Sequence, residues 1–224
     1  MTESRMNRRE SPMNPNEPPK ENTTGLLRLF VYGTLKRGCW NHERFCRGVL
    51  SVEEAVVRGR LYELPSGIPV LEVPEADVLA HGTANPLADV ATCLRADTHR
   101  QAQARPAGHL ASYHEPMPDK SAGQRIWTCQ RHARRVRRAM DGEHQSATVG
   151  GWCPVYGELL TFDDPESRLP AIDRLEGFHP GGSNMYCRVL VPAITGETVV
   201  PVWLYVGDEI IKRRLAPLGK SRWL

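Results

Sequence analysis

LFVYGTLKRG (residues 29–38) is a short apolar strand that runs directly into a turn bracketed by two glycines. A strand that ends in glycine lets the backbone approach a ligand closely, and the N–H groups of such a turn can point together at a carboxylate or phosphate. The segment that starts at Tyr32 therefore predicts an anion-binding turn, to which Asn41 and His42 add polar groups. The alternative is that Tyr32 is a strand residue with a polar tip and that Gly33 only begins a turn.

The length and composition are typical of a globular protein. The chain has 224 residues, of which 40% are hydrophobic, and this is enough to bury a core. Its formal net charge of +3 is too small to indicate a nucleic-acid or membrane partner by itself. No apolar run approaches the roughly 18 residues that span a bilayer, so we expect no membrane association.

Residues 1–25 are rich in Pro, Asn, Glu and Arg and lack the apolar core of a secretory signal. We predict that they form a disordered leader and that the protein is cytoplasmic. The six cysteines show no CxxC spacing, so we expect reduced thiols. Cys129 with His132, and Cys93 with His99, do not make up the four-ligand set of a zinc site. We therefore expect neither a metal nor another cofactor.

Two β-rich segments, residues 26–93 and 150–210, are predicted to form one domain, followed by a C-terminal tail at 211–224. The expected strands are 29–31, 55–64, 68–71, 155–160, 186–191 and 199–206, with a hairpin turn at 195–197.

Residues 94–149 differ from both segments, because they are rich in Arg, Gln and His and poor in periodic aliphatic residues. We predict a basic, poorly ordered insertion with at most one short helix. The run RHARRVRR at 131–138 offers the alternative that this segment binds nucleic acid. Aromatic residues that would interleave with the arginines are missing beyond Trp127, so we do not expect a nucleic-acid partner.

Residues 163–177 carry the signals of a short helix, since Asp164 can cap its start and Gly177 suits a left-handed stop. Glu176 follows Ile172 by four positions and so lies beside the apolar face of the helix. Its carboxylate is therefore expected to tilt toward the interior.

Glu176 also occupies the last turn of that helix, where the backbone carbonyls present partial negative charge. Burial and the helix terminus should both raise its pKa above the roughly 4.3 of a free glutamate, toward the range useful for proton transfer near neutrality. The alternative is that the carboxylate points to water or pairs with Arg174, Arg188 or His179.

Several short motifs occur in both segments, and together they are more informative than any one of them. In order, they are YGTLKRG (32–38), NH (41–42), GRLY (59–62), VYGEL (155–159), IDRLEG (172–177), YCR (186–188) and WLY (203–205). Together they resemble the gamma-glutamylcyclotransferase family, specifically its AIG2-like and gamma-glutamylamine cyclotransferase branch. The resemblance implies an α+β fold, a small mixed β-barrel with flanking helices, whose cavity binds a small-molecule gamma-glutamyl substrate.

The resemblance also implies an activity, the cyclisation of a gamma-glutamyl amide or amine to 5-oxoproline with release of the amine. It assigns catalysis to Glu176 as general base and then acid. It assigns substrate binding to Tyr32, Gly33, Thr34 and Leu35, and adds Tyr186 and Tyr205 as residues that position the amine. The long insertion departs from the compact family pattern, and the alternative function is a non-catalytic module of the same fold that binds a small carboxylate.

Overall fold

The computed structural model describes residues 25–104, 151–209 and 215–223. Nearly all of the predicted leader and most of the predicted insertion, including the arginine run at 131–138 and the Cys129–His132 pair, lie outside the described residues. None of the described helices is long and apolar enough to cross a membrane. The cytoplasmic location stays a prediction.

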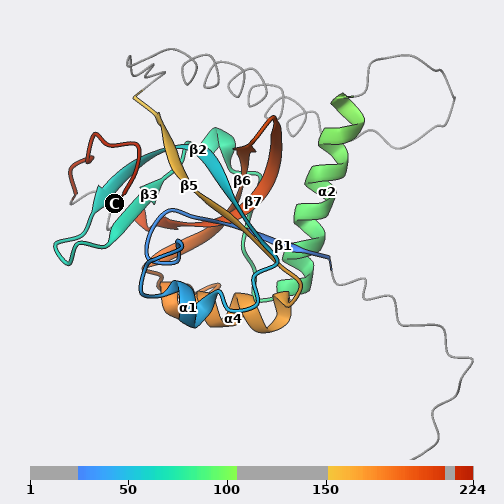
Figure 1. Cartoon of the computed structure of the whole chain (residues 1–224), viewed down its shortest axis with the longest axis horizontal. Coiled ribbons are helices and arrows are strands. Elements are labelled where there is room, and N and C mark those ends of the chain that lie inside the picture. Colours follow the sequence, from blue (N-terminus) through green and yellow to red (C-terminus); the bar gives the residue numbers. More distant parts are fainter. Residues whose placement is uncertain (1–24, 105–150, 210–214, 224) are drawn as a thin grey trace, which may run out of the picture.

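Five strands form a closed barrel (Figure 1). They are β1 (Leu27–Val31), β2 (Ser51–Glu63), β5 (Cys153–Phe162), β6 (Tyr186–Thr195) and β7 (Thr198–Gly207). The strand order is β2-β5-β1-β7-β6, and a pairing between Val56 and Ile194 closes the barrel from β6 back to β2. Because β1 and β7 run parallel while the other neighbours run antiparallel, the barrel is mixed, which confirms the fold class expected from the sequence.

Two further strands extend the sheet beside the barrel. The second half of β2 continues past β5 and pairs with β3 (Pro69–Glu72) through a tight turn in which Gly67 has a φ of 79°. β4 (Ala80–His81) pairs with β6 after a short 3-10 helix at Glu75–Asp77. The hairpin of β2 and β3 therefore projects beside the barrel (Figure 1).

In the part of the chain that the structure describes, three helices flank the barrel: α1 (His42–Phe45), α2 (Pro86–Ala104) and α4 (Pro165–Glu176). α1 and α4 lie against each other at one end of the barrel, and α2 runs along its side in contact with α4 and β7 (Figure 1). α4 begins at Pro165 and is capped by Gly177. The φ of Gly177 is 63°, which is the left-handed stop that the sequence predicts.

α2 continues to Ala104, past residue 93, where the sequence placed the end of the first barrel segment. The helix is held to the barrel beyond that point, since Asp97 accepts a hydrogen bond from Arg28 of β1 at 2.7 Å. Residues 94–104 thus belong to a helix docked on the barrel, whereas 105–149 lie outside the described residues. The division of the chain into domains otherwise stays a prediction.

β1 is buried on both of its faces, which explains its continuous apolar sequence. Leu29 packs in a cluster that includes Ile172 of α4, while Phe30 packs in a second cluster built mainly from the other barrel strands. β5 lies so close to β1 that a Cβ at Gly157 would stand 2.3 Å from the carbonyl oxygen of Val31. Only glycine fits there, and this contact sets where the end of β1 emerges.

Candidate active site

A cavity opens where β1 ends, with about 380 Å³ of empty space including its open mouth. It is lined by Phe30, Val31, Tyr32, Gly33, Thr34, Leu35, Ile68, Pro69, Glu176, Tyr186 and Tyr205. All seven residues that the sequence nominated for catalysis or substrate binding are in this set. Their roles are not shown by their placement, and they stay predictions.

The carbonyl groups of the turn after Tyr32 are bonded by residues further along the same loop. Lys36 N–H donates to the Gly33 carbonyl at 3.0 Å, and Asn41 N–H donates to the Thr34 carbonyl at 3.2 Å. The Asn41 side chain also donates to the Thr34 hydroxyl at 2.9 Å. Asn41 therefore supports the turn from behind and does not line the cavity.

The N–H groups of the turn have no such partners. Within the described residues, none of the backbone N–H groups of Gly33, Thr34 and Leu35 donates a hydrogen bond. Three donors on neighbouring residues of the cavity wall are thus available to an acceptor. Successive backbone N–H groups without partners can form an anion-binding concavity without a charged side chain.

Two contacts hold the turn in place from outside the loop. Glu158 of β5 accepts hydrogen bonds from the Arg37 backbone N–H at 2.8 Å and from its Nε at 2.9 Å. Gly33 faces the hairpin, and a Cβ there would stand 2.8 Å from Cγ of Pro69. The turn is therefore fixed between β5 on one side and β3 on the other.

Glu176 enters the cavity from the last turn of α4 and is half-buried. Burial raises its pKa to about 7, in the direction expected from the sequence. In the described part of the chain, no hydrogen bond or ion pair involves its carboxylate, and Arg188 pairs with other carboxylates. The side chain is thus free to contact a ligand.

Three tyrosines shape the wall with hydroxyl groups that are already bonded to the protein. Tyr32 donates to the Tyr205 carbonyl at 2.9 Å, and Tyr186 donates to the Pro69 carbonyl at 3.0 Å. Burial is the largest cause that raises the pKa of each of the three, and the nearby Glu176 adds to it for Tyr32 and Tyr186. All three hydroxyls therefore stay protonated at neutral pH.

Tyr205 reaches the cavity from β7 and donates its hydroxyl proton to Asp173 at 2.6 Å. Asp173 lies one turn before Glu176 in α4. Desolvation raises the pKa of Asp173, while its hydrogen bond from Tyr205 and the charge of Arg188 oppose that rise. The carboxylate that holds Tyr205 and the carboxylate that lines the cavity thus come from the same helix end.

Four lining residues were not predicted from the sequence, namely Phe30, Val31, Ile68 and Pro69. Ile68 and Pro69 come from the hairpin of β2 and β3, which folds over the turn. The available signal in the sequence was an apolar residue, Ile68, directly after the turn glycine. Its side chain is partly exposed, as expected for an apolar residue that lines an open cavity. As far as the described residues go, the lining contains no cationic side chain.

Possible metal ligands do not gather in the described part of the chain, where no three His, Cys, Asp or Glu side chains come together in a way that could hold an ion. Cys93 is buried in α2 and its thiol donates to the Pro201 carbonyl at 3.3 Å. Burial raises the pKa of this thiol to about 12, so it behaves as a packed core residue.

The chain was compared with curated proteins and with solved structures. No curated protein matches the chain. Two solved structures share 14% identity with it: an AIG2-like protein from Mus musculus, with 86% of each chain covered and a TM-score of 0.42, and YkqA from Bacillus subtilis, with 88% of this chain covered and a TM-score of 0.41. The chain spans only 39% of YkqA.

A family model gives the clearest match. The model described as gamma-glutamyl cyclotransferase, AIG2-like, matches residues 29–103 and 108–224, which is most of the chain and includes the turn, α2 and α4. The chain therefore belongs to the AIG2-like gamma-glutamyl cyclotransferase family.

Proposed function

We propose that the protein is an enzyme that cyclises a gamma-glutamyl amine or amide to 5-oxoproline and releases the amine. The observation that carries the proposal is the meeting of two regions far apart in the sequence. Glu176, with a pKa of about 7, lines the same cavity as the turn from Tyr32 to Leu35. Family membership supports a reaction of this type.

The turn would hold the substrate by its α-carboxylate. The N–H groups of Gly33, Thr34 and Leu35 supply neutral donors for this group, and the cavity wall brings no cationic side chain near it among the described residues. A fixed carboxylate leaves the α-amino group of the glutamyl unit free to approach its own γ-carbonyl. Holding reacting groups in this geometry removes much of the entropic barrier to cyclisation.

Glu176 would move the proton that the reaction requires. As the α-amino nitrogen attacks the γ-carbonyl carbon and forms the ring C–N bond, the carboxylate takes one proton from that nitrogen. Glu176 then delivers the proton to the nitrogen of the leaving amine while the amide C–N bond breaks. The same side chain is restored at the end, and a pKa near neutrality suits both steps.

Tyr186 and Tyr205 would orient the α-amino group of the substrate. Each hydroxyl proton is already donated to the protein, to the Pro69 carbonyl and to Asp173 respectively. Their oxygens keep lone pairs that can accept a hydrogen bond from an amino group. We therefore assign Tyr186 and Tyr205 to positioning the α-amino group of the substrate.

The test is release of 5-oxoproline from a panel of gamma-glutamyl amines. We expect Glu176→Gln to lower kcat on the order of 100-fold or more, because the amide cannot accept and return the proton. Glu166→Gln is the matched control, since Glu166 is an exposed carboxylate in the first turn of the same helix, and it should match wild type.

Failure of the wild-type protein to release 5-oxoproline from any compound that it binds would contradict the enzymatic proposal. Calorimetry with the same compounds then separates the alternative. A non-catalytic module would bind a small carboxylate with equal affinity in wild type and in Glu176→Gln.

A further inference from the structure

Arg188 lies behind the cavity wall and is fully buried, although it carries a charge. It belongs to β6, where it pairs across the strands with Tyr205 of β7. Arg188 itself does not line the cavity. A buried guanidinium in this place needs an explanation, because moving a charge out of water is strongly unfavourable unless the charge is well paired.

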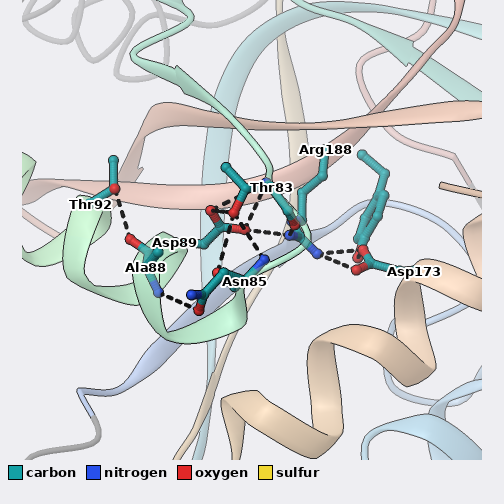
Figure 2. A network of polar contacts seen from close by, with 8 residues as sticks. Thr83, Asn85, Ala88, Asp89, Thr92, Asp173 and Arg188 are labelled. Atoms are coloured by element: carbon teal, nitrogen blue, oxygen red, sulfur yellow. Dashed lines mark hydrogen bonds and ion pairs between the residues drawn. The ribbon is translucent and has the colours of Figure 1, made fainter. Parts of the chain in front are cut away.

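The guanidinium divides its donors between two helices. Nη1 binds both carboxylate oxygens of Asp173 in α4, at 2.6 Å for Oδ2. Nη2 binds Asp89 in α2 and donates to the Thr83 carbonyl at 2.8 Å. Figure 2 shows Arg188 between these two carboxylates. A planar group with several fixed donors can make such contacts at once, whereas a lysine ammonium cannot.

Aromatic rings and a glycine complete the surroundings of Arg188. Its guanidinium carbon lies 5.1 Å from the ring centre of Phe178 and 5.7 Å from that of Trp203. A Cβ at Gly82 would stand 2.7 Å from Nε of Arg188, so the backbone fits closely against the side chain. Phe178 follows α4 directly, and its N–H donates to the Asp173 carbonyl at 2.8 Å.

These contacts reach the cavity through two residues. The Asp173 carboxylate that binds Arg188 also accepts the hydroxyl of Tyr205, a lining residue, at 2.6 Å. Asp173 also lies one turn before Glu176, so the position of the Asp173 side chain fixes the end of the helix from which Glu176 projects. Tyr205 and Glu176 thus depend on the same anchor.

We propose that Arg188 is a positioning residue, which holds Asp173 so that Tyr205 and Glu176 face the substrate together. This inference rests on the proposed function, in which Glu176 transfers the proton. The anchor acts on geometry, since Arg188 touches no part of the cavity. Displacement of a reacting group by about 1 Å can lower a rate on the order of 100-fold.

The variant that tests the proposal is Arg188→Lys, which keeps the charge and removes the planar group. The matched control is Arg58→Lys, because Arg58 makes a similar pair with Asp77 through Nε at 2.7 Å and Nη2 at 2.6 Å, away from the cavity. Both variants should remain folded with a lower Tm. We expect only Arg188→Lys to lower kcat, by about 10-fold to 100-fold, with KM changed by less than about threefold because the turn is intact.

A second readout does not require turnover. Titration of the Glu176 carboxyl by ¹³C NMR should give a lower pKa in Arg188→Lys than in wild type, because displacement of the helix end exposes Glu176 to water. Arg58→Lys should leave this pKa unchanged. Since both substitutions conserve charge, the difference reports geometry. If wild type releases no 5-oxoproline, the proposed function fails, and the titration still decides the positioning role.

A smaller change provides a further test in case Arg188→Lys does not fold. Tyr205→Phe removes the hydrogen bond to Asp173, and Tyr62→Phe removes a similar bond to Glu72 at 2.7 Å outside the cavity. We expect only Tyr205→Phe to lower the pKa of Glu176 in the absence of substrate, a readout that does not depend on the contact between Tyr205 and the substrate. Wild-type kcat and an unchanged Glu176 pKa in Arg188→Lys, or an unchanged Glu176 pKa in Tyr205→Phe if the lysine variant is unfolded, would overturn the proposal.

Discussion

At the scale of single residues, the proton transfer that we propose for Glu176 and the stability of the fold are opposed. Burial raises the pKa of Glu176 to about 7. At a pH between the pKa of an unfolded glutamate and neutrality, Glu176 is therefore protonated in the folded protein and ionised in the unfolded chain. Stability contributed by this group is therefore highest below the unfolded pKa and is lost as the pH rises through the folded value. Residues that transfer protons often carry such a cost.

This sign leads to a prediction for Glu176→Gln. Because the amide does not ionise, the variant should be more stable than wild type at pH 8, by about 1 to 3 kcal/mol, and the gain should disappear at pH 4. Urea unfolding at the two pH values measures the difference. A gain of equal size at both would contradict the assigned pKa, and Glu166→Gln, on the exposed face of the same helix, provides the control.

Individual residues of the site were predicted better from the sequence than the contacts between distant elements. The seven nominated residues line one cavity. The glycine turn and the helix end had local signals in the sequence, whereas Tyr186 and Tyr205 were nominated by the resemblance to the family. The anchor of Arg188 had no such signal. Its two carboxylate partners are 15 and 99 positions away in the chain, and only the folded barrel brings them to one guanidinium.

At the scale of elements, the pairing of β1 with β5 decides where the turn emerges. Phe30 and Val31 lie opposite Leu159 and Glu158, and Gly157 provides the space for this close approach. Glu158 then binds Arg37 in the loop beyond the turn. One strand thus supports both the end of β1 and the loop that follows it.

We expect Gly157→Ala to destabilise the protein by about 3 kcal/mol, because the added methyl group meets the carbonyl oxygen of Val31 at 2.3 Å and a backbone atom cannot rotate away. The midpoint of urea unfolding measures the loss. Gly182→Ala is the control, since a Cβ there stands at least 3.3 Å from its neighbours in an exposed loop, and it should change stability by less than about 0.5 kcal/mol.

The elements themselves could be predicted where the sequence pattern was strong. Apolar runs marked every barrel strand, and Asp164 and Gly177 marked the ends of α4. α2 was not predicted from the sequence, because few apolar residues, Val90 and Cys93 among them, form its buried side. The ion pair of Asp97 with Arg28 that holds its second half depends on tertiary contact.

At the scale of the whole molecule, the segment 215–223 packs against one side of the barrel. Trp223 is buried, its indole N–H donates to Glu63 at 3.2 Å, and its carbonyl accepts from Lys36 at 2.6 Å. Its ring also meets Trp40 edge to face. The sequence predicted only a tail here, because its partners lie in β2 and in the loop after the turn.

We expect Trp223→Ala to cost about 3 kcal/mol of stability, since it removes a buried indole and two long-range contacts. Trp40→Ala should cost less than about 1 kcal/mol, because Trp40 is 65% exposed and loses mainly the edge contact. Thermal unfolding followed by circular dichroism compares the two. Equal losses would show that the segment 215–223 contributes little to the fold.

The closure of the barrel has a kinetic consequence. The turn after β1 lies in the first part of the sequence, whereas Glu176 and Tyr205 lie in the last third. The parallel pairing of β1 with β7 brings the ends of these two strands to the same rim of the barrel. Such long-range pairings form late in folding. Recovery of the proposed 5-oxoproline release during refolding should therefore lag behind recovery of strand signal, so that this activity would report completed topology.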